Sequence, residues 1–385
     1  KVDGIWSNNK EDAINVNFLD FDIQNIWKVL KPSDFDLSGT LSGYAKFSQK
    51  EDAYTLESDL AIPNLSVEKQ YLGKLTVSSD WSEINDAIHS KATLLRNNTP
   101  IFSIDGNYEI EDGSLDYTLG LKEFKMNLLE GFAKDYFTKL NGTSDGELRI
   151  QGTLDQPVVN GSINFDIPAI TLAETGVTYH LKETLNVENS GIVFDNFKIS
   201  DATNNSATIN GEVLLSMEKN SNINLNISAK KLRILENSYQ PLAYGNARAT
   251  ADLEVSGDFK NIKVMGSVTT DNNSKIIVPF DAASDIGDND FITFINPADS
   301  AKYYERNGIL FIPTGSTTPL TFDVDFKLNP TSEVQVLFES NSGSVLKTRG
   351  TADLFISRNQ FEKQTIIGDY RVERGSFYYS LENIV

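Results

Sequence analysis

"LTFDVDFKL", residues 320–328, alternates between apolar and polar residues at nearly every position. Every second side chain of a β-strand points to the same face. The segment therefore predicts a strand with Leu, Phe and Val on one face and mainly Thr, Asp and Lys on the other. The pattern leaves open what covers the apolar face. In a closed sandwich it is a second layer of protein, and in an open trough it is a ligand from outside.

The bulk composition of the chain excludes several classes of function. Its 385 residues include 34 Lys and Arg against 54 Asp and Glu, which gives a net charge of −20. Such a field repels phosphate backbones and anionic bilayer surfaces, so we expect no nucleic-acid partner. The absence of cysteine excludes disulfides and thiolate chemistry. No apolar run approaches the roughly 20 residues of a membrane-spanning helix, and we expect any membrane anchor to lie outside this fragment.

Strands with alternating apolar residues recur along the chain at intervals of roughly 100 residues. The copies are "SGYAKFSQ" (42–49), "DGELRIQG" (145–152), "ATADLEVSG" (249–257) and "GTADLFIS" (350–357). A second strand follows two of them and carries a glycine, Gly161 or Gly266, in its middle. No Pro-rich or Gly/Ser-rich linker separates the copies. The chain is therefore predicted to be mostly β, with one elongated, continuous sheet rather than a row of sandwiches.

Apolar residues at helical spacing predict short amphipathic helices in three segments. These are residues 21–32, residues 123–140 and, more weakly because Pro241 interrupts it, residues 230–245. We expect the helix of 123–140 to pack its apolar face on the sheet; the alternative is that it lies over the mouth of a trough and partly gates it. Residues 281–319, rich in Asp, Asn, Pro and Gly, are predicted to be an irregular acidic loop.

Candidate catalytic and metal sites are weak. Two histidines, His89 and His180, stand at alternating strand positions without an evident partner. The match "GTSDG" around Ser144 has a predicted helix before it and a strand after it, the reverse of a nucleophile elbow, and indicates a helix-to-strand turn. The acidic loop lacks the spacing of an EF-hand; its carboxylates are Asp281, Asp285, Asp288 and Asp290. We expect no catalytic residue, no metal and no cofactor, and hence no enzyme.

Several stretches taken in order resemble one known family. They are "GELRIQGTLDQPVVNGSINF" (146–165), "ATADLEVSGDFKNIKVMGSV" (249–268) and "GDYRVERGSFYYSLENIV" (368–385). Together they resemble the C-terminal region of the TamB family, the inner-membrane-anchored subunit of the translocation and assembly module, within the wider AsmA-like group. The resemblance covers residues 35–385.

The resemblance implies a fold and a function. The expected fold is a long β-sheet curled into a U-shaped groove, the β-taco, with a few short amphipathic helices. The expected location is the periplasm, bridging the inner and outer membranes. The expected function is to carry phospholipid and to support outer-membrane biogenesis and protein assembly with an outer-membrane barrel partner, TamA or a relative. The alternative is an elongated structural or adhesive β-protein with closed hydrophobic cores and no lipid transport.

Repeats and resemblance together divide the chain into four regions. Residues 1–141 are expected to form an AsmA-like β-groove repeat with amphipathic helices, and residues 142–280 a second β-groove repeat. The irregular acidic loop follows at 281–319, and residues 320–385 are expected to form a C-terminal TamB-type β segment.

Two sets of residues are expected to carry the function. The first set consists of alternating apolar positions that would line the lipid groove: Leu148, Ile150, Ile163, Phe165, Ile223, Leu225, Ile227, Leu253, Val255, Phe322, Val324, Phe326, Leu328, Val334, Val336, Phe338, Leu354 and Ile356. The second set belongs to the last strand, whose unpaired edge a partner strand would extend: Tyr370, Val372, Phe377, Tyr379 and Leu381.

Overall fold

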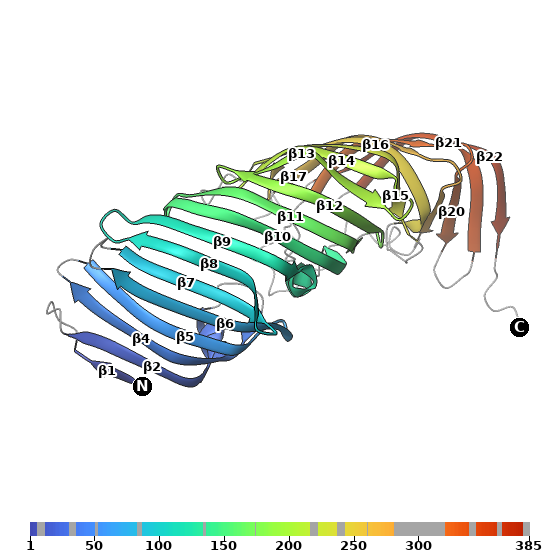
Figure 1. Cartoon of the computed structure of the whole chain (residues 1–385). Helices are drawn as coiled ribbons and strands as arrows, with labels where there is room; N and C mark the ends of the chain where they lie inside the picture. Colours follow the sequence, from blue (N-terminus) through green and yellow to red (C-terminus); the bar gives the residue numbers. More distant parts are fainter. Residues whose placement is uncertain are drawn as a thin grey trace, which may run out of the picture. The chain divides into compact units, whose positions relative to one another are not determined.

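The computed structural model describes residues 1–5, 12–30, 36–50, 53–82, 87–133, 136–173, 175–215, 222–236, 243–259, 261–280, 320–338, 344–359 and 364–379 (Figure 1). The chain divides into two compact units. The N-terminal unit comprises residues 1–173, 179–197 and 214–219, and the C-terminal unit comprises residues 174–178, 198–213 and 220–385.

The described part of the chain is mostly β, as the sequence predicts. Strands β1 to β11 are Val2–Gly4, Ala13–Asp22, Leu37–Ser38, Thr40–Lys50, Ala53–Val67, Gln70–Ser82, Ala87–Arg96, Thr99–Glu109, Ser114–Lys125, Phe137–Thr153 and Pro157–Leu172. Strands β12 to β22 are Thr178–Glu188, Gly191–Asp201, Ser206–Leu214, Asn222–Leu235, Tyr244–Asp258, Asn261–Thr270, Lys275–Phe280, Leu320–Leu328, Glu333–Phe338, Ser344–Arg358 and Gln364–Tyr378.

In the N-terminal unit, consecutive strands pair antiparallel from β4 to β11, and β2 lies beside β4 (Figure 1). Two-residue turns join several of them. At Glu68-Lys69 and at Asn97-Asn98 both turn residues have positive φ, between 48° and 65°. Turns of this conformation match the right-handed twist of the flanking strands. The local turn chemistry therefore supports a sheet built in chain order.

In the C-terminal unit, two pairs of strands depart from the antiparallel order. β16 pairs antiparallel with β17 and, further along, with β18. β17 then pairs in parallel with β19, and β18 in parallel with β20. Hydrogen bonds join the turn between β17 and β18 to the turn between β19 and β20. The Glu333 N–H donates to the Ser274 carbonyl at 2.7 Å, and the hydroxyl oxygens of Thr270 and Ser332 are 3.1 Å apart. β21 pairs antiparallel with β19, β20 and β22.

The register gives the sheet of the N-terminal unit two chemically different faces. On the apolar face, directly opposed residues form a row across β5 to β10: Leu60, Val77, Ala92, Ile104, Leu119 and Leu148. On the polar face, the neighbouring row is Asp59, Ser78, Lys91, Asp105, Thr118 and Arg149. The alternation predicted from the sequence is thus kept in register from strand to strand.

Glycines with positive φ interrupt the apolar face at regular places. They lie inside strands, and each is directly opposite a leucine of a paired neighbouring strand. The pairs are Gly43–Leu60, Gly161–Leu148, Gly266–Leu253 and Gly368–Leu354, with φ between 127° and 144°. A Cβ at any of them would collide with a backbone carbonyl of the facing strand. Glycine is therefore required there, and such kinks introduce curvature into a sheet.

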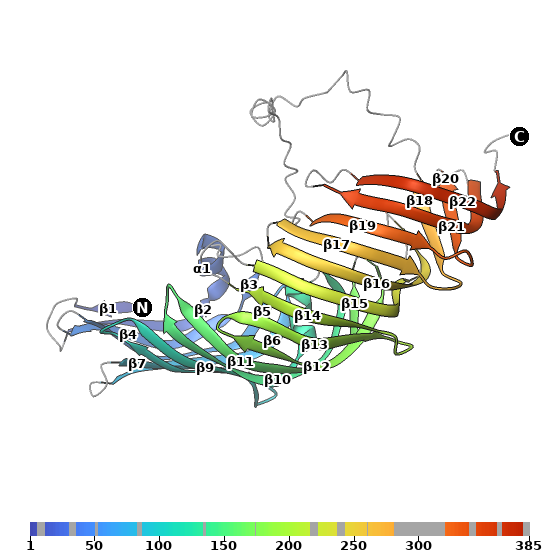
Figure 2. The ribbon, with the colours of Figure 1, turned by 90° about the horizontal axis from the view of Figure 1, so that it is seen from above.

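The helical content is smaller than predicted. The prediction for 21–32 is confirmed by α1 (Ile23–Leu30), which lies beside β3 and starts where the Asp22 carboxylate accepts the Gln24 N–H at 3.0 Å (Figure 2). The prediction for 123–140 is wrong at both ends: η1 (Met126–Leu129) and α2 (Glu130–Ala133) are helical, but residues 123–125 belong to β9 and residues 137–140 to β10. Apolar residues from two strand ends and one turn happen to follow a helical spacing.

The weaker helix prediction for 230–245 is also wrong in its described part. Residues 230–235 belong to β15, and β16 begins at Tyr244. Pairing of residues 232–235 with β16 outweighs the local helical pattern. The acidic loop of 281–319 lies outside the described residues, and the four-part division of the chain stays a prediction.

A buried carboxylate fixes the turn between β13 and β14 in the C-terminal unit. Asp201 is 1% exposed and accepts hydrogen bonds from the Thr203 N–H (2.8 Å), the Thr203 hydroxyl (2.7 Å) and the Asn205 N–H (3.1 Å). It also accepts the Arg233 N–H of β15 at 3.0 Å. Burial raises the pKa of Asp201, but these hydrogen bonds outweigh burial and hold the pKa below its usual value.

The first prediction concerns the glycine kinks. Gly161→Ala should destabilise the N-terminal unit by about 1–3 kcal/mol, because alanine at this φ is strained and its Cβ meets backbone. Gly120→Ala in β9 is the control, since its φ is not positive and the new Cβ meets only the hydroxyl of Ser103. Urea unfolding followed by circular dichroism measures both. Equal stabilities of the two variants would contradict the assignment.

The second prediction concerns Asp201. A carboxyl with a lowered folded pKa contributes stability above its unfolded pKa, about 3.9, and loses it as the pH falls through the folded value. Asp201→Asn should cost on the order of 2 kcal/mol at pH 7. The unfolding free energy of the variant should also fall less steeply below pH 4 than that of the native chain. Parallel pH dependences in urea titrations would show that Asp201 does not contribute.

Candidate functional site

The register places the predicted groove residues on one face within each unit. In the N-terminal unit, Leu148 and Ile150 of β10 share a face with Ile163 and Phe165 of β11. In the C-terminal unit, one row of directly opposed residues runs across five strands: Ile227, Leu253, Gly266, Val324 and Ile356. The neighbouring row contains Leu225, Val255, Val264 and Phe322. Val334, Val336 and Phe338 of β20 face the even-numbered residues of β21.

These residues are covered only in part. Of the eighteen predicted groove residues, Ile223 and Leu328 are buried at 6% and 5% exposure, and the other sixteen are half-buried. Between the two sheets of a sandwich, most such side chains would be fully enclosed. The apolar face therefore presents hydrocarbon that the described residues leave partly accessible.

One part of the apolar face is closed, and helical segments close it. In the N-terminal unit, Leu128 of η1 is 1% exposed and packs with Leu65, Leu94 and Ile101. Ile23 of α1 packs against the same cluster. A second cluster of buried residues lies next to it and contains Met126, Leu140 and Ile167.

Hydrogen bonds hold η1 and α2 in this position. The Gln70 side-chain amide donates to the Asn127 carbonyl at 2.7 Å, and the Leu140 N–H donates to the Glu130 carboxylate at 2.9 Å. The described part of the predicted 123–140 segment thus packs its apolar side on the sheet. We define the closed edge as the buried cluster of Leu65, Leu94, Ile101 and Leu128, together with the partly buried apolar residues packed against it, which include Ile23 and Phe102.

Sequence reasoning overlooked much of the apolar face of the N-terminal unit. The alternation in 53–67 and 87–96 is interrupted by serines and by register shifts near Ile62 and Leu94, and this obscured the signal. The residues that it missed include Leu60, Ile62, Leu75, Val77, Leu94, Phe102, Ile104, Leu119 and Leu121.

The histidines lie on strands, as predicted. His89 is on the polar face, where its Nε2 is 2.8 Å from one carboxylate oxygen of Asp105. The Lys91 ammonium bonds the other oxygen at 2.8 Å, and mainly for this reason the pKa of Asp105 is below its usual value. His180 is half-buried in β12.

Two other weak candidate sites were the motif around Ser144 and the aspartates of the acidic loop, and only the first lies in the described residues. Ser144 is 1% exposed in the middle of β10, so the prediction of a helix-to-strand turn there is wrong, because β10 begins at Phe137. A serine enclosed within a paired strand is also no nucleophile elbow. The four aspartates of the acidic loop lie outside the described residues.

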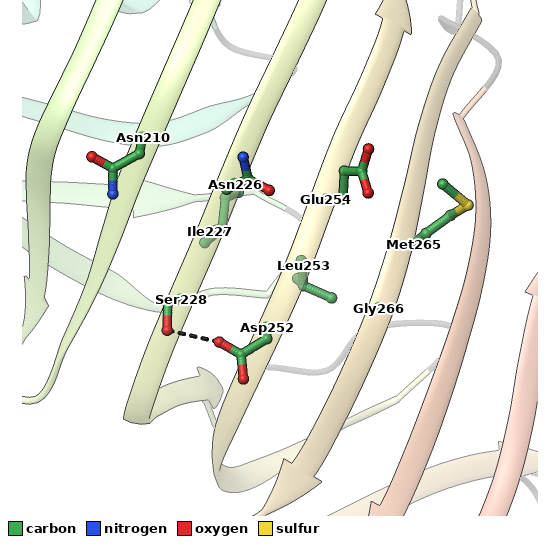
Figure 3. Close-up of a pocket in the computed structure, with 9 residues that line it drawn as sticks. All are labelled: Asn210, Asn226, Ile227, Ser228, Asp252, Leu253, Glu254, Met265 and Gly266. Atoms are coloured by element: carbon green, nitrogen blue, oxygen red, sulfur yellow. Dashed lines mark hydrogen bonds between the residues drawn. The ribbon is translucent and has the colours of Figure 1, made fainter.

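A hollow of about 360 Å³ opens in the C-terminal unit across β14 to β17 (Figure 3). Its lining combines amides and carboxylates of the polar face, Asn210, Asn226, Asp252 and Glu254, with Ser228, Ile227, Leu253, Met265 and Gly266. The Ser228 hydroxyl donates to Asp252 at 2.7 Å. No histidine or lysine is in this lining, so the pair lacks the base that a serine nucleophile requires.

Within the described ranges, no three or more His, Asp or Glu residues are grouped so that they could hold a metal ion. Likewise, no helix in the described part of the chain has the length and hydrophobicity needed to cross a membrane.

The last described strand is exposed on both faces. Within the described part of the chain, β22 pairs with β21 alone. Among the predicted partner-edge residues, Tyr370, Val372, Phe377 and Tyr379 are 36–62% exposed, and Leu381 lies outside the described residues. The Tyr370 hydroxyl donates to the Thr348 hydroxyl at 2.7 Å. The rings of Phe377 and Phe338 are arranged edge to face, with their centroids 6.0 Å apart.

Comparisons with known proteins give two family matches. A model described as the TamB N-terminal domain matches residues 4–165, and a model described as the TamB C-terminal domain matches residues 194–382. No curated protein and no solved structure matches the chain.

The third prediction separates the closed edge from the rest of the apolar face. Leu128→Ala should cost about 3–4 kcal/mol, because it leaves a cavity in an enclosed cluster. Leu148→Ala removes the same atoms from a half-buried site and should cost about 1–2 kcal/mol. Urea unfolding of the two variants measures the difference. A Leu148→Ala cost as large as that of Leu128→Ala would indicate that the apolar face is enclosed throughout.

Proposed function

The chain belongs to the TamB family, and from this premise we propose that its apolar face carries phospholipid between the inner and outer membranes. The observation that carries the proposal is the half-buried apolar face, which register keeps in phase from strand to strand. A contiguous apolar face that stays partly accessible over several strands is typical of a binding surface.

The energetics of tail binding fit this role. Apolar area removed from water contributes roughly 25 cal/mol per Å². Covering a few hundred Å² of an acyl chain therefore contributes several kcal/mol. Extracting a tail from a bilayer costs about 0.8 kcal/mol per CH₂. A groove that covers the tail on one side offsets much of this cost without trapping the lipid.

The character of the apolar face fits passage rather than chemistry. The predicted groove residues are uncharged and aliphatic or aromatic, so no position is a deep trap for a sliding tail. We propose that the chain is not an enzyme and uses no cofactor. Its direct ligand is phospholipid, and its effect on outer-membrane protein assembly follows from the same bridge.

Location and protein partner are proposed from the family. We propose that the chain works in the periplasm and that an outer-membrane barrel of the TamA kind is its partner. The exposed edge of β22 supports this proposal, because unpaired N–H and C=O groups accept a further strand.

The fourth prediction tests lipid carriage. Val324→Asp introduces a charge into the apolar face opposite Gly266 and Ile356. Phospholipid that co-purifies with the chain, measured by native mass spectrometry, should fall at least fivefold while circular dichroism stays unchanged, since a half-exposed carboxylate keeps part of its hydration.

Thr269→Asp is the matched control for this experiment. It adds the same charge on the exposed polar face, opposite Lys327, and should leave bound lipid unchanged. Unfolding of Val324→Asp, or repeated lipid-free preparations of the native chain, would favour a structural or adhesive protein with closed cores.

The fifth prediction tests the partner edge. A photo-reactive benzoylphenylalanine at Tyr379 should crosslink to a purified TamA-type barrel in a lipid nanodisc. The same group at Tyr44, which is 40% exposed against 62% for Tyr379 and lies on β4, should give no adduct. Adducts of equal yield from both positions would contradict the assignment of β22 as the specific docking edge.

A further inference from the structure

The apolar face of the N-terminal unit changes character along its strands, from one row to the next. Beside the closed edge, the directly opposed residues of β5 to β8 are Ile62, Leu75, Leu94 and Phe102. Two rows further on, they are Ser58, Ser79, Ser90 and Gly106. The next row contains Trp81, Ile88 and Tyr108. From β5 to β7, hydrocarbon thus gives way to a row of serine hydroxyls, followed by a mixed row in which Trp81 and Tyr108 flank Ile88.

The closed edge cannot receive a polar group. Leu128 is 1% exposed there, Leu94 and Ile101 are each 6% exposed, and Phe102 packs against them. A phosphate or ester placed in this cluster would lose its hydration and find only hydrocarbon, at a cost of several kcal/mol. Acyl-chain ends carry no such cost.

The opposite rows offer neutral hydrogen-bond donors. The Ser79 and Ser90 hydroxyls are 3.3 Å apart, a long bond that leaves donor and acceptor capacity on both. Ser58 and Ser79 are each 5% exposed, so their hydroxyls lie within the apolar face rather than in bulk solvent. Trp and Tyr side chains such as those of Trp81 and Tyr108 favour the boundary between hydrocarbon and water.

Charged groups are kept away from these rows. In β7 and β8, the side chains of Lys91, Asp105 and His89 belong to the polar face, where Asp105 contacts both of the others. A headgroup at the serine row therefore meets hydroxyl and indole donors without a fixed charge nearby. Ester carbonyls and phosphate oxygens are the acceptors that such donors suit.

We propose that phospholipid lies across the N-terminal unit with a fixed polarity, its acyl-chain ends at the closed edge and its glycerol esters and headgroup at the row of Ser58, Ser79 and Ser90. This inference rests on the proposed function, because it specifies how the lipid that the apolar face carries is oriented. The closed edge sets the orientation, and the serines position the polar end.

The experiment uses the absence of native cysteine. Phe102→Cys and Tyr108→Cys, each labelled with bimane, place a fluorophore at the two ends of the apolar face on the same strand. Six residues of extended strand separate them by about 20 Å. The probes are phosphatidylglycerols with a nitroxide quencher at carbon 5 or carbon 16 of one acyl chain, presented to the purified chain.

The carbon-16 nitroxide should quench the label at residue 102 at least twofold more than the label at residue 108, and the carbon-5 nitroxide should show the reverse order. Equal quenching at both sites, or the opposite order, would overturn the fixed polarity while leaving lipid binding intact. A lack of quenching at both sites by both lipids would refute lipid binding to this unit, and the inference with it.

A second pair of variants tests the serines. Adding Ser58→Ala and Ser90→Ala to the two labelled chains should bring the quenching ratios to within about 1.3-fold of unity. Thr76→Ala and Thr93→Ala change directly opposed residues of the polar face and should leave the ratios as they were. Ratios that survive the serine substitutions would overturn the role of the serines in positioning the lipid.

Discussion

Cross-strand register is the constraint on which the rest of this structure depends. Side chains alternate with a period of two, so a slip of one residue in any strand moves its whole apolar set to the other face. In the N-terminal unit, such a slip in β7 would place Lys91 between Val77 and Ile104 on the apolar face. Tight turns with positive φ and obligatory glycines prevent the slip. Local chemistry at a few residues thus maintains a continuous apolar face.

A partly uncovered apolar face has a cost in stability, and the structure offsets it locally. Half-buried leucines contribute less than enclosed ones, because part of their area stays in water. The ladders of backbone hydrogen bonds and the cluster around Leu128 supply stability that the open face does not. In the C-terminal unit, the carboxylate of Asp201 binds a turn to a neighbouring strand in a similar way. The exposed face can therefore remain available for a ligand.

Alternation of apolar and polar residues was enough to predict strands and their apolar faces. It could not predict which strands pair when the partners are distant in the chain. The segment 320–328 is β19, and its apolar side is the face that was expected. Nothing in that segment indicates that β19 pairs in parallel with β17, because the partner lies 50 residues or more earlier in the chain. The helix of 123–140 was predicted from spacing alone, whereas pairing of Phe124 and Lys125 with β10 and of residues 137–140 with β11 makes both ends strands. Ser144 was misplaced by the same error.

The direction of the rows connects the fold with the proposed transport. Rows run perpendicular to the strands, so movement from β5 to β7, in steps of about 4.8 Å, follows one row and keeps its chemistry. A lipid passing from β5 to β7 would exchange the Ser58 hydroxyl for that of Ser79 and then of Ser90, while its tails exchange Ile62 for Leu75 and Leu94. Each step replaces contacts by equivalent ones, so the barrier between neighbouring positions stays low. Rotation of the lipid would bring its headgroup to the closed edge and is strongly disfavoured. A sheet with graded rows therefore permits sliding along one axis and fixes orientation along the other.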